Sequence, residues 1–590
     1  MTVPTRPSEA LGLLLRVTAY DPTELSVLPG PPFPGGEIDI DTPFQVNLLG
    51  AQTVTYMAAT IGRSTAPSDT PANTYVPGKY SGEINFGSVL FTGVDPITPG
   101  TITALGGGAP ADFMVGRGGS TVVAGSSSFA AGTSTVGGID LIDPDGELDD
   151  DVLKSWPGAK VDVLRGDPAS AFSTWTVVAV FYASGIVWDV LQKQIKLRDP
   201  GWLLSAAPLH DYRYLGTGGV EGDDTLANTL KPILFGQCFN VSPRQILASL
   251  LVYQVSCTSV QAITAVRDKG AAVTLDTSVG TAGNFADYAT LTAATIASGK
   301  YVTCTALGLF RLNATPTGQI TCDCQGDADT IGGIGYTASR AGIVGRIAIG
   351  RGTLKLAADQ FDTASFSAMG GAQTGACGWY FDTAITKAAA IAQVLGGILG
   401  YSYFTPAGLL SIGYLDEPSS TADFTVRIPG GTATAFHIDA RGEPTMQIYG
   451  APRQATYLGY QKNYTVQTQD QLAGTVTQAN AAIYGQPTKL VQSVSSQAAR
   501  DVPSLNIVTI DSGFVNQSDA QTEANRQQRV MGRQRDRYAV EVDADPFAEV
   551  QGSTAGLVGW SRFNMGGSKN FRVVGVGVGA RNVVTYELWG

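Results

Sequence analysis

The sequence predicts a mainly β fold with minor α content, divided into β-barrel domains and small α+β domains with few short helices. Three observations support this. Gly accounts for 72 of the 590 residues and charged residues for only 15%, against about 7% and about 25% in average proteins. Hydrophobic residues make up 44% and aromatic residues 9%, which excludes a disordered chain. The length is too great for one core and predicts roughly three to five domains.

The charge pattern limits the classes of function. The net charge of −12 argues against a protein that binds DNA without regard to sequence, since such binding relies on cationic side chains. A surface with few charges is typical of subunits that are buried against one another. The apolar run at residues 11–15 is too short for a signal peptide or a membrane span. We therefore expect synthesis in the cytosol without membrane insertion.

Composition and pattern divide the chain into five regions with approximate boundaries. Because β-branched and aromatic residues favour strands, we expect strands in the first region at residues 11–20, 44–51 and 82–91, followed by a Gly/Ser-rich loop at 100–137. The regions are an N-terminal β-rich part (1–135), a β-barrel or meander (136–230), a middle α+β module (231–360), a helix-on-hairpin domain (361–470) and a C-terminal β domain with one helix (471–590).

The second region opens with an acidic run, DPDGELDDDV, at residues 143–152. Its glycine follows the second acid instead of the third, so it does not fit an EF-hand loop, and a Pro-Asp-Gly turn explains it without a calcium ion. Four closely spaced strands are expected at residues 159–165, 175–182, 185–190 and 194–198. The Gly-rich segment YRYLGTGGVEG at 212–222 lacks the Lys-Ser/Thr of a phosphate-binding loop, and we interpret it as a loop at a domain junction.

Residues 231–276, KPILFGQCFNVSPRQILASLLVYQVSCTSVQAITAVRDKGAAVTLD, are the most informative stretch. Ser242 and Pro243 look like the N-cap and first residue of a short helix at 244–254. Residues 259–266 alternate as a strand, and the polar turn at 267–270 precedes another strand. Further strands are expected at 301–312 and 318–324.

Two helices are expected later in the chain. Apolar residues from Ile385 to Leu399 recur at helical spacing, and a hairpin with strands near 401–404 and 409–414 follows. Ser518 and Gln521 form a plausible capping box for a helix at 519–535. Arginines late in this helix complement its C-terminus; contact with nucleic acid or with an acidic loop of a partner is the alternative. Closing strands are expected at 539–542, 557–562, 570–578 and 582–588, ending in a packed Trp589.

A search for chemistry leaves no candidate catalytic, cofactor-binding or metal-binding residue. The two histidines, His210 and His437, are not near a nucleophile elbow, and HExxH is absent. A two-carboxylate glycosidase is not excluded by motif, but the acids cluster in turns. Cys322 and Cys324 lie two apart, on one face of a predicted strand. A metal site there needs two further ligands, and small reduced core residues are the simpler interpretation. We therefore predict no enzyme activity and no cofactor.

Three segments in order carry a resemblance to a known family: residues 231–276, then YVTCTALGLFRLNATPTGQITCDCQGD at 301–327, then GLVGWSRFNMGGSKNFRVVGVGVGARNVVTYELWG at 556–590. The DPDGELDDDV turn and the YRYLGTGGVEG loop fit the same proteins. Together they resemble tail hub proteins, also called baseplate hub or tail-tip proteins, of long-tailed bacteriophages and prophages. The resemblance covers about residues 136–590, and the role of residues 1–135 stays open.

The resemblance implies a structural virion protein that closes the distal end of the tail tube. Such hubs are usually homotrimers in which each subunit supplies two tail-tube-like β-barrel domains. The implied partners are the distal tail and tail-tube proteins and the tip spike or fibres, with phage DNA passing through the channel unbound and host contact only indirect. The implied location is the virion tail tip, assembled in the host cytoplasm. A tail-tip receptor-binding adhesin, indicated by the Gly- and Tyr-rich loops, and a tip-borne cell-wall hydrolase are the alternatives.

Overall fold

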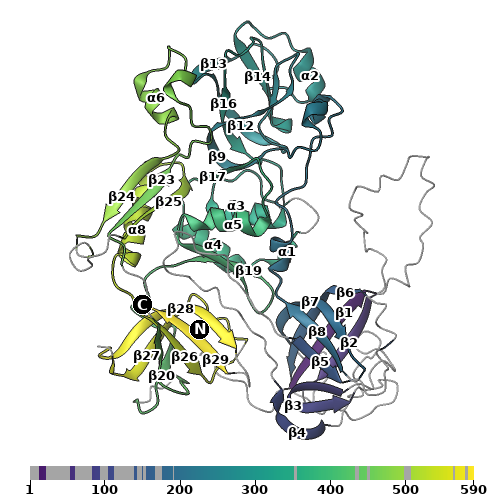
Figure 1. The fold of residues 1–590 in the computed structure, drawn as a ribbon, viewed down its shortest axis with the longest axis vertical. Helices are drawn as coiled ribbons and strands as arrows, with labels where there is room; N and C mark the ends of the chain where they lie inside the picture. Colours follow the sequence, from purple (N-terminus) through teal and green to yellow (C-terminus); the bar gives the residue numbers. More distant parts are fainter. Residues whose placement is uncertain are drawn as a thin grey trace.

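The computed structural model describes strands at intervals within residues 12–142, and then most of the chain from residue 155 (Figure 1). Outside those strands it also describes residues 149 and 174. From residue 176 onward the description has gaps at 191, 332, 351–354, 432–436, 448–451, 497, 499–505, 546, 563–564 and 579–582. Within the described residues, strands in several sheets predominate and helices are few, which confirms the predicted mainly β, multidomain fold. None of the described helices is both long enough and apolar enough to cross a membrane.

The first domain, here called the N-terminal barrel, is an eight-stranded sheet that curls on itself in Figure 1. Its strand order is β2-β1-β6-β7-β8-β5-β3-β4, and every pair is antiparallel. Because β1 pairs with β6, the predicted boundary at 135/136 falls inside one sheet. The strands are β1 Gly12–Tyr20, β2 Thr53–Ala59, β3 Glu83–Thr92, β4 Ala104–Ala111, β5 Gly138–Ile142, β6 Ser155–Gly166, β7 Thr176–Trp188 and β8 Gln192–Arg198.

Two predictions in this domain were wrong in detail. Strand β4 lies within the region 100–137, which was predicted as a loop because its Gly and Ala residues give little side-chain signal. The two strands predicted on either side of residue 184 are one strand, β7. A bulge between Ala183 and Gly185 shifts the register with β8, and the pairing of β7 with β8 continues on both sides of it. The predicted strand at 44–51 lies outside the described residues.

The second domain is a nine-stranded sheet of order β10-β11-β15-β14-β13-β12-β16-β9-β17. It includes β17, which comes after residue 360, so the predicted boundary at 360/361 also falls inside a sheet. Helix α2, Tyr288–Ala293, packs beside β14. The strands are β9 Ile233–Val241, β10 Arg244–Leu247, β11 Val252–Gln254, β12 Val260–Asp268, β13 Ala271–Leu275, β14 Lys300–Cys304, β15 Leu309–Leu312, β16 Ile320–Gly326 and β17 Gly378–Phe381.

The helix predicted at residues 244–254 is instead the hairpin β10–β11. Arg244 pairs with Gln254 and Gln245 with Tyr253, so the stretch folds back on itself. The predicted N-cap, Ser242, accepts a hydrogen bond from the side chain of Gln319 through its hydroxyl. The segment Val252–Gln254 is fully buried and pairs with β15, and this tertiary pairing overrides the local helix signal.

The turn predicted at 267–270 is confirmed. Asp268 pairs with Ala271, leaving Lys269 and Gly270 as a two-residue turn with φ of 50° and 75°. Positive φ at both central positions is the type I′ geometry that matches the twist of a hairpin. The predicted strands on either side are β12 and β13.

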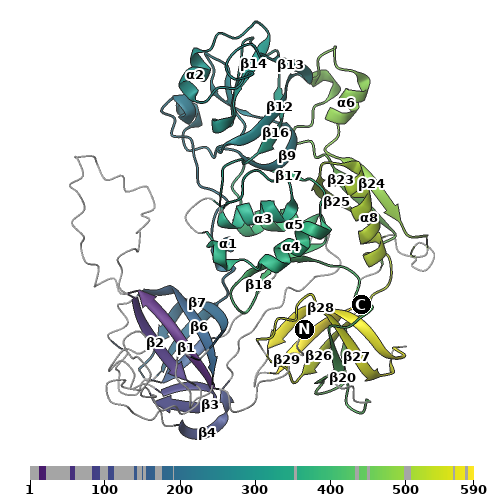
Figure 2. The ribbon, with the colours of Figure 1, turned by 180° about the vertical axis from the view of Figure 1, so that it is seen from behind.

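A helical layer lies between the nine-stranded sheet and the remaining domains (Figures 1 and 2). The predicted helix-on-hairpin unit is confirmed as α5, which packs on the hairpin β18–β19. Thr386 caps α5 by accepting a hydrogen bond from the backbone N–H of Ala389. The elements are α1 Trp202–Ser205, α3 Arg340–Ile349, α4 Thr363–Ala372, α5 Lys387–Gly396, β18 Gly400–Phe404 and β19 Leu410–Tyr414.

The late helix is α8, Gln517–Met531, which covers one face of a small sheet. The predicted capping box was wrong, because Asn516 is the N-cap and makes no side-chain cap. Gln521 instead donates to the backbone carbonyl of Gln492 in the neighbouring sheet. Helix α6, Gln478–Tyr484, lies beside the nine-stranded sheet in Figure 1. The small sheet has the order β24-β23-β25, with β23 Ala455–Tyr460, β24 Lys489–Val494 and β25 Ile507–Phe514.

The last domain, here called the C-terminal barrel, joins two separated parts of the chain and crosses the predicted boundary at 470/471. Its order is β21-β20-β27-β28-β29-β26-β22. The two sides close because Arg441 N–H donates to the carbonyl of Glu541 (2.9 Å) and Asp543 N–H to that of Asp439 (3.0 Å). Trp589 is 1% exposed, confirming the packed chain end. The strands are β20 Phe424–Arg427, β21 Ile438–Asp439, β22 Thr445–Gln447, β26 Arg537–Val542, β27 Thr554–Trp560, β28 Gly567–Val578 and β29 Val584–Trp589.

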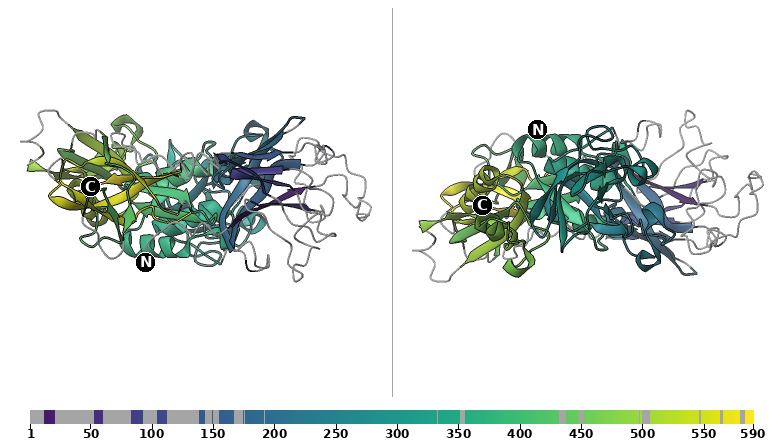
Figure 3. Two further views of the ribbon diagram at one scale, coloured as in Figure 1. Left: turned by 90° about the horizontal axis from the view of Figure 1, so that it is seen from below. Right: turned by 90° about the horizontal axis from the view of Figure 1, so that it is seen from above.

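The two barrels lie side by side at one end of the molecule, and the nine-stranded sheet lies at the other end (Figures 1 and 2). Seen along the long axis, the two barrels stand at opposite sides of the helical layer (Figure 3). The molecule therefore has a two-barrel end and a distal end.

Candidate functional site

The histidines and the acidic run do not assemble a catalytic or metal centre among the described residues. His210 is buried and stacks on Tyr212 with ring centroids 5.8 Å apart, while His437 lies 3.6 Å from Asp439. Of the acidic run only Asp149 is described, and its carboxylate lies 2.9 Å from the ammonium of Lys193. Within the described part of the chain, no three His, Cys, Asp or Glu side chains are placed to hold a metal ion.

Cys322 and Cys324 lie on one face of β16, as the sequence predicted, with their sulfur atoms 3.6 Å apart. Cys238 on β9 stands opposite Cys324, and all three side chains are buried. Burial raises the pKa of Cys322, with a smaller contribution from the neighbouring Cys324. The thiol therefore stays protonated at neutral pH, which suits a core residue and not a metal ligand or a nucleophile.

The arginines of α8 and of the segment just after it are paired within the chain. Arg529 in the last turn of α8 and Arg535 beyond its end both contact Glu417, at 3.1 and 2.6 Å. Arg526 pairs with Glu523 at 2.6 Å and donates to the carbonyl of Leu415 at 2.5 Å. The sequence left open that these arginines contact an acidic loop of a partner. In the structure, acidic residues of this chain itself pair with them. These contacts tie α8 to the segment that leads into the C-terminal barrel.

A direct contact joins the two barrels. Arg165, at the end of β6, donates two hydrogen bonds to the carboxylate of Asp545, at 2.9 and 2.7 Å. The two side chains are only 15% and 17% exposed, and the guanidinium also lies 5.3 Å from the ring centroid of Phe547. A bidentate pair of this kind fixes orientation as well as distance. The pair therefore holds the N-terminal barrel against the loop between β26 and β27.

The hairpin β18–β19 makes a second connection between the barrels. On one side, the carbonyl of Pro406 in its turn accepts a hydrogen bond from Val180 N–H on β7, at 2.8 Å. On the other side, the hydroxyl of Tyr403 donates to Glu549 in the C-terminal barrel, at 2.9 Å. Both barrels thus contact the same hairpin, and α5 covers the hairpin from the helical layer. We call this hairpin and the Arg165–Asp545 pair the barrel junction.

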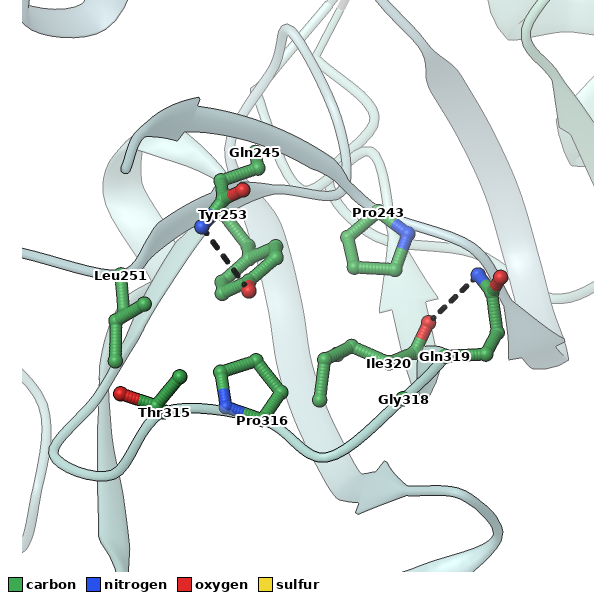
Figure 4. Close-up of a pocket in the computed structure, with 9 residues that line it drawn as sticks. All are labelled: Pro243, Gln245, Leu251, Tyr253, Thr315, Pro316, Gly318, Gln319 and Ile320. Atoms are coloured by element: carbon green, nitrogen blue, oxygen red, sulfur yellow. Dashed lines mark hydrogen bonds between the residues drawn. The ribbon is translucent and has the colours of Figure 1, made fainter. Parts of the chain in front are cut away.

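A pocket of about 390 Å³ lies in the distal nine-stranded domain, between the hairpin β10–β11 and the loop before β16 (Figure 4). Gln245 Nε2 donates to the hydroxyl of Tyr253 at 3.2 Å, and Gln319 Nε2 donates to the hydroxyl of Ser242 at 2.8 Å. Burial raises the pKa of Tyr253, with a smaller effect from the carboxylate of Asp268, so the hydroxyl keeps its proton. The lining residues are Pro243, Gln245, Leu251, Tyr253, Thr315, Pro316, Gly318, Gln319 and Ile320.

Neither the pocket nor the barrel junction was predicted from the sequence. Among the apolar residues in or next to the stretch predicted as a helix, Ile246 and Val255 are buried in the core, whereas Leu251 lines the pocket. The one local signal was Pro316 followed by Gly318, which predicts a turn beside a strand but not a cavity.

Comparison with known proteins gives similarity to solved structures only. No protein-family model and no curated protein matches the chain. The structure is similar to a chain in the virion of a native gene transfer agent particle, with 11% identity and a TM-score of 0.33, over 61% of this chain and 84% of that chain. It is also similar to the 43 kDa tail protein of prophage MuSo2 from Shewanella oneidensis, with 10% identity and a TM-score of 0.31, over 86% and 98% of the two chains.

A third similar structure is the tail protein from Neisseria meningitidis MC58, with 12% identity and a TM-score of 0.21, over 35% of this chain and 54% of that chain. The structures to which the chain is similar are therefore those of virion and phage tail proteins. Scores of this size fix neither the position of this protein in a particle nor its partners.

Proposed function

We propose that the protein is a structural component of a phage tail and forms the hub at the distal end of the tail tube. The ordered sequence segments support this, because they resemble tail hub proteins at residues 231–276, 301–327 and 556–590. The observation that carries the proposal is the pair of barrels held side by side at one end of the molecule (Figure 1). A hub of three copies needs two such barrels from each copy to match a six-fold tube.

The barrel junction gives this arrangement a physical basis. Two barrels joined only by a flexible linker would rotate independently. They would therefore not keep a fixed position relative to each other where they meet the ring of the tail tube. The bidentate Arg165–Asp545 pair and the shared hairpin restrict that rotation. In the proposed assembly the two-barrel end meets the tail tube, and the distal end closes the channel and anchors the spike or fibres.

The charge of the chain is consistent with a channel for DNA. With a net charge of −12, an acidic or neutral lumen would let phosphates pass, whereas a basic wall would bind them through the release of counterions. A strongly basic inner wall in a structure of the assembled tip would contradict this part of the proposal. The proposed location is the virion tail tip, after assembly in the host cytoplasm.

The test is tail assembly without the protein. Phage particles produced without this chain are expected to show failed tail initiation in electron micrographs, and normal tails would refute the hub. Light scattering of the purified chain, alone and with the distal tail protein, is expected to give the mass of a trimer. A monomer in both samples would contradict the three-copy hub.

A second candidate, a tail-tip adhesin, is favoured by one observation, the pocket at the distal end. An adhesin predicts that the purified protein binds host cells and blocks infection. A hub that only closes the tube predicts neither result, so a cell-binding assay separates the two functions.

A further inference from the structure

The pocket between β10–β11 and the loop before β16 has uncharged walls. None of its nine lining side chains is ionised at neutral pH. An anion would lose hydration on entry without gaining a counter-ion, and that cost disfavours it. The carboxylate of Asp268 beside the loop already accepts hydrogen bonds from the backbone N–H groups of Thr317 and Gly318, at 2.7 and 2.9 Å. The lining therefore favours a neutral molecule.

The walls combine apolar faces with fixed hydrogen-bonding groups. Figure 4 shows Tyr253 in the middle of the pocket, with Leu251 on one side and Pro243 on the other. One face of the Tyr253 ring stacks on Phe310, with centroids 5.2 Å apart and an interplanar angle of 13°, which holds the ring in place. The aliphatic C–H groups of Leu251, Pro243 and Pro316 can pack against the apolar face of a saturated ring, and Tyr253, which is 6% exposed, contributes through its hydroxyl.

The polar groups lie on the exposed side of the pocket, where Gln245 and Gln319 are both open to solvent. Gln245 and Gln319 each use their amide nitrogen for a bond within the protein, at 3.2 and 2.8 Å. Each amide oxygen then has no partner among the described residues and can accept a hydrogen bond from a ligand hydroxyl. The hydroxyl of Tyr253 accepts from Gln245, so its own proton can be donated to a ligand oxygen. Two acceptors and one donor around apolar walls match a ring that carries several hydroxyls.

We propose that this pocket binds a neutral pyranose sugar unit. Its volume of about 390 Å³ is near the lower end of small-ligand sites, which hold compact molecules. An extended proline-rich peptide fits less well, because such peptides dock along exposed aromatic grooves and Tyr253 is only 6% exposed. The site lies at the end of the molecule opposite the two barrels (Figure 1). This inference goes beyond the proposed structural role, which needs no ligand.

The test uses the full chain and free sugars. Saturation-transfer NMR with glucose, galactose and N-acetylglucosamine is expected to give binding for at least one sugar. The uronic acid of a hexose that binds (glucuronic or galacturonic acid), in which a carboxylate replaces the CH2OH group, is expected to bind at least ten-fold more weakly than that hexose. Gln319→Leu and Gln245→Leu should each weaken binding about five-fold, since each removes one net hydrogen bond. Gln478→Leu is the matched control, because Gln478 is an exposed amide on α6 outside the pocket, and it should leave binding unchanged.

Three outcomes would overturn the proposal: none of the neutral sugars binds, the uronic acid binds as well as the hexose that binds, or the two Gln variants bind like the unaltered protein. A proline-containing peptide that binds where the sugars do not would also overturn it. Solubilised peptidoglycan fragments and purified outer polysaccharide then distinguish the two sources of such a ring.

Particles with both Gln substitutions should assemble normal tails but attach to cells less well, so a failed sugar site and a failed hub give different results.

Discussion

The barrel junction makes a quantitative prediction through the Arg165–Asp545 pair. Arg165→Met keeps most of the aliphatic length of the side chain but leaves the Asp545 carboxylate without its cation. Asp545→Asn is the reciprocal change, and it keeps the Oδ1 atom that accepts a hydrogen bond from Phe547 N–H at 3.0 Å. Together the two variants remove the ionic contact with little change to the packing.

The expected size follows from burial. A fully buried pair costs about 3–5 kcal/mol when one partner is removed, and an exposed pair costs under about 1 kcal/mol. Because the side chains here are 15% and 17% exposed, we expect each single variant to lower the free energy of unfolding by about 2 kcal/mol. The double variant should lose about 1–2 kcal/mol less than the sum of the two, because the second change breaks no further contact.

The assay is urea-induced unfolding of the full chain, with the first transition fitted for the four proteins of the cycle. The matched control is the Arg562–Glu443 pair, whose closest atoms are 2.9 Å apart, against 2.7 Å for Arg165–Asp545, but whose side chains are 64% and 57% exposed. Its coupling energy should be below about 0.5 kcal/mol. Strictly additive effects of Arg165→Met and Asp545→Asn, or equal coupling in both pairs, would refute a stabilising role for the junction.

Three further predictions concern the core. Arg346→Met should lower stability by about 3–5 kcal/mol in thermal unfolding, because Asp327, at 3.0 Å and 1% exposed, would remain buried without its cation; an effect under 1 kcal/mol would contradict this. Gly236→Ala should lower the free energy of unfolding by about 2–4 kcal/mol, because the φ of Gly236 is +67° and a Cβ there would lie 2.0 Å from a backbone oxygen. Gly335 has open space around it, so Gly335→Ala should change that free energy by less than about 0.5 kcal/mol. Burial lowers the pKa of Lys387 from 10.5 to about 8. The unfolded chain therefore binds more protons between these two pH values, and stability should rise from pH 8 to 10.5. Lys387→Met should flatten that rise, and an unchanged stability profile in this variant would show that another group causes the rise.

Local sequence patterns were sufficient to predict a helix or strand when the element it packs on or pairs with is near in sequence. The hairpin β18–β19 and the turn at Lys269-Gly270 were predicted because adjacent strands and turn residues carry their own signal. Helix α5 was predicted because one of its faces is apolar. These elements need no information from distant residues.

Helix α3 escaped prediction for a physical reason. It is buried on nearly every side, so even its polar residues lie in the core, where the sequence pattern does not mark them as buried. Its two arginines, Arg340 and Arg346, look like surface residues in the sequence but are 0% and 2% exposed. Arg346 pairs with Asp327, and Arg340 donates to the backbone carbonyl of Ser512 at 2.8 Å. Burial of such charges depends on partners that only the folded chain supplies.

The candidate sites could not be predicted from the sequence because the residues that form them are far apart in the chain. Arg165 and Asp545 are 380 residues apart, and neither residue stands out from other charged residues near a strand end. The pocket depends on the hairpin β10–β11, which the local pattern predicted as a helix. A site built on a wrongly predicted element cannot be found from that prediction.

The order of the chain also explains why the junction depends on noncovalent contacts. The hairpin β18–β19 is followed at once by β20, so it is covalently close to the C-terminal barrel. The described contacts of its turn with the N-terminal barrel include the bond from Val180 to Pro406. Among the described residues, separation of the N-terminal barrel from the junction would break the bidentate Arg165–Asp545 pair as well as this bond. Because the Arg165–Asp545 pair is bidentate, it restricts the angle between the barrels as well as their distance, which a single backbone hydrogen bond to the hairpin turn does not.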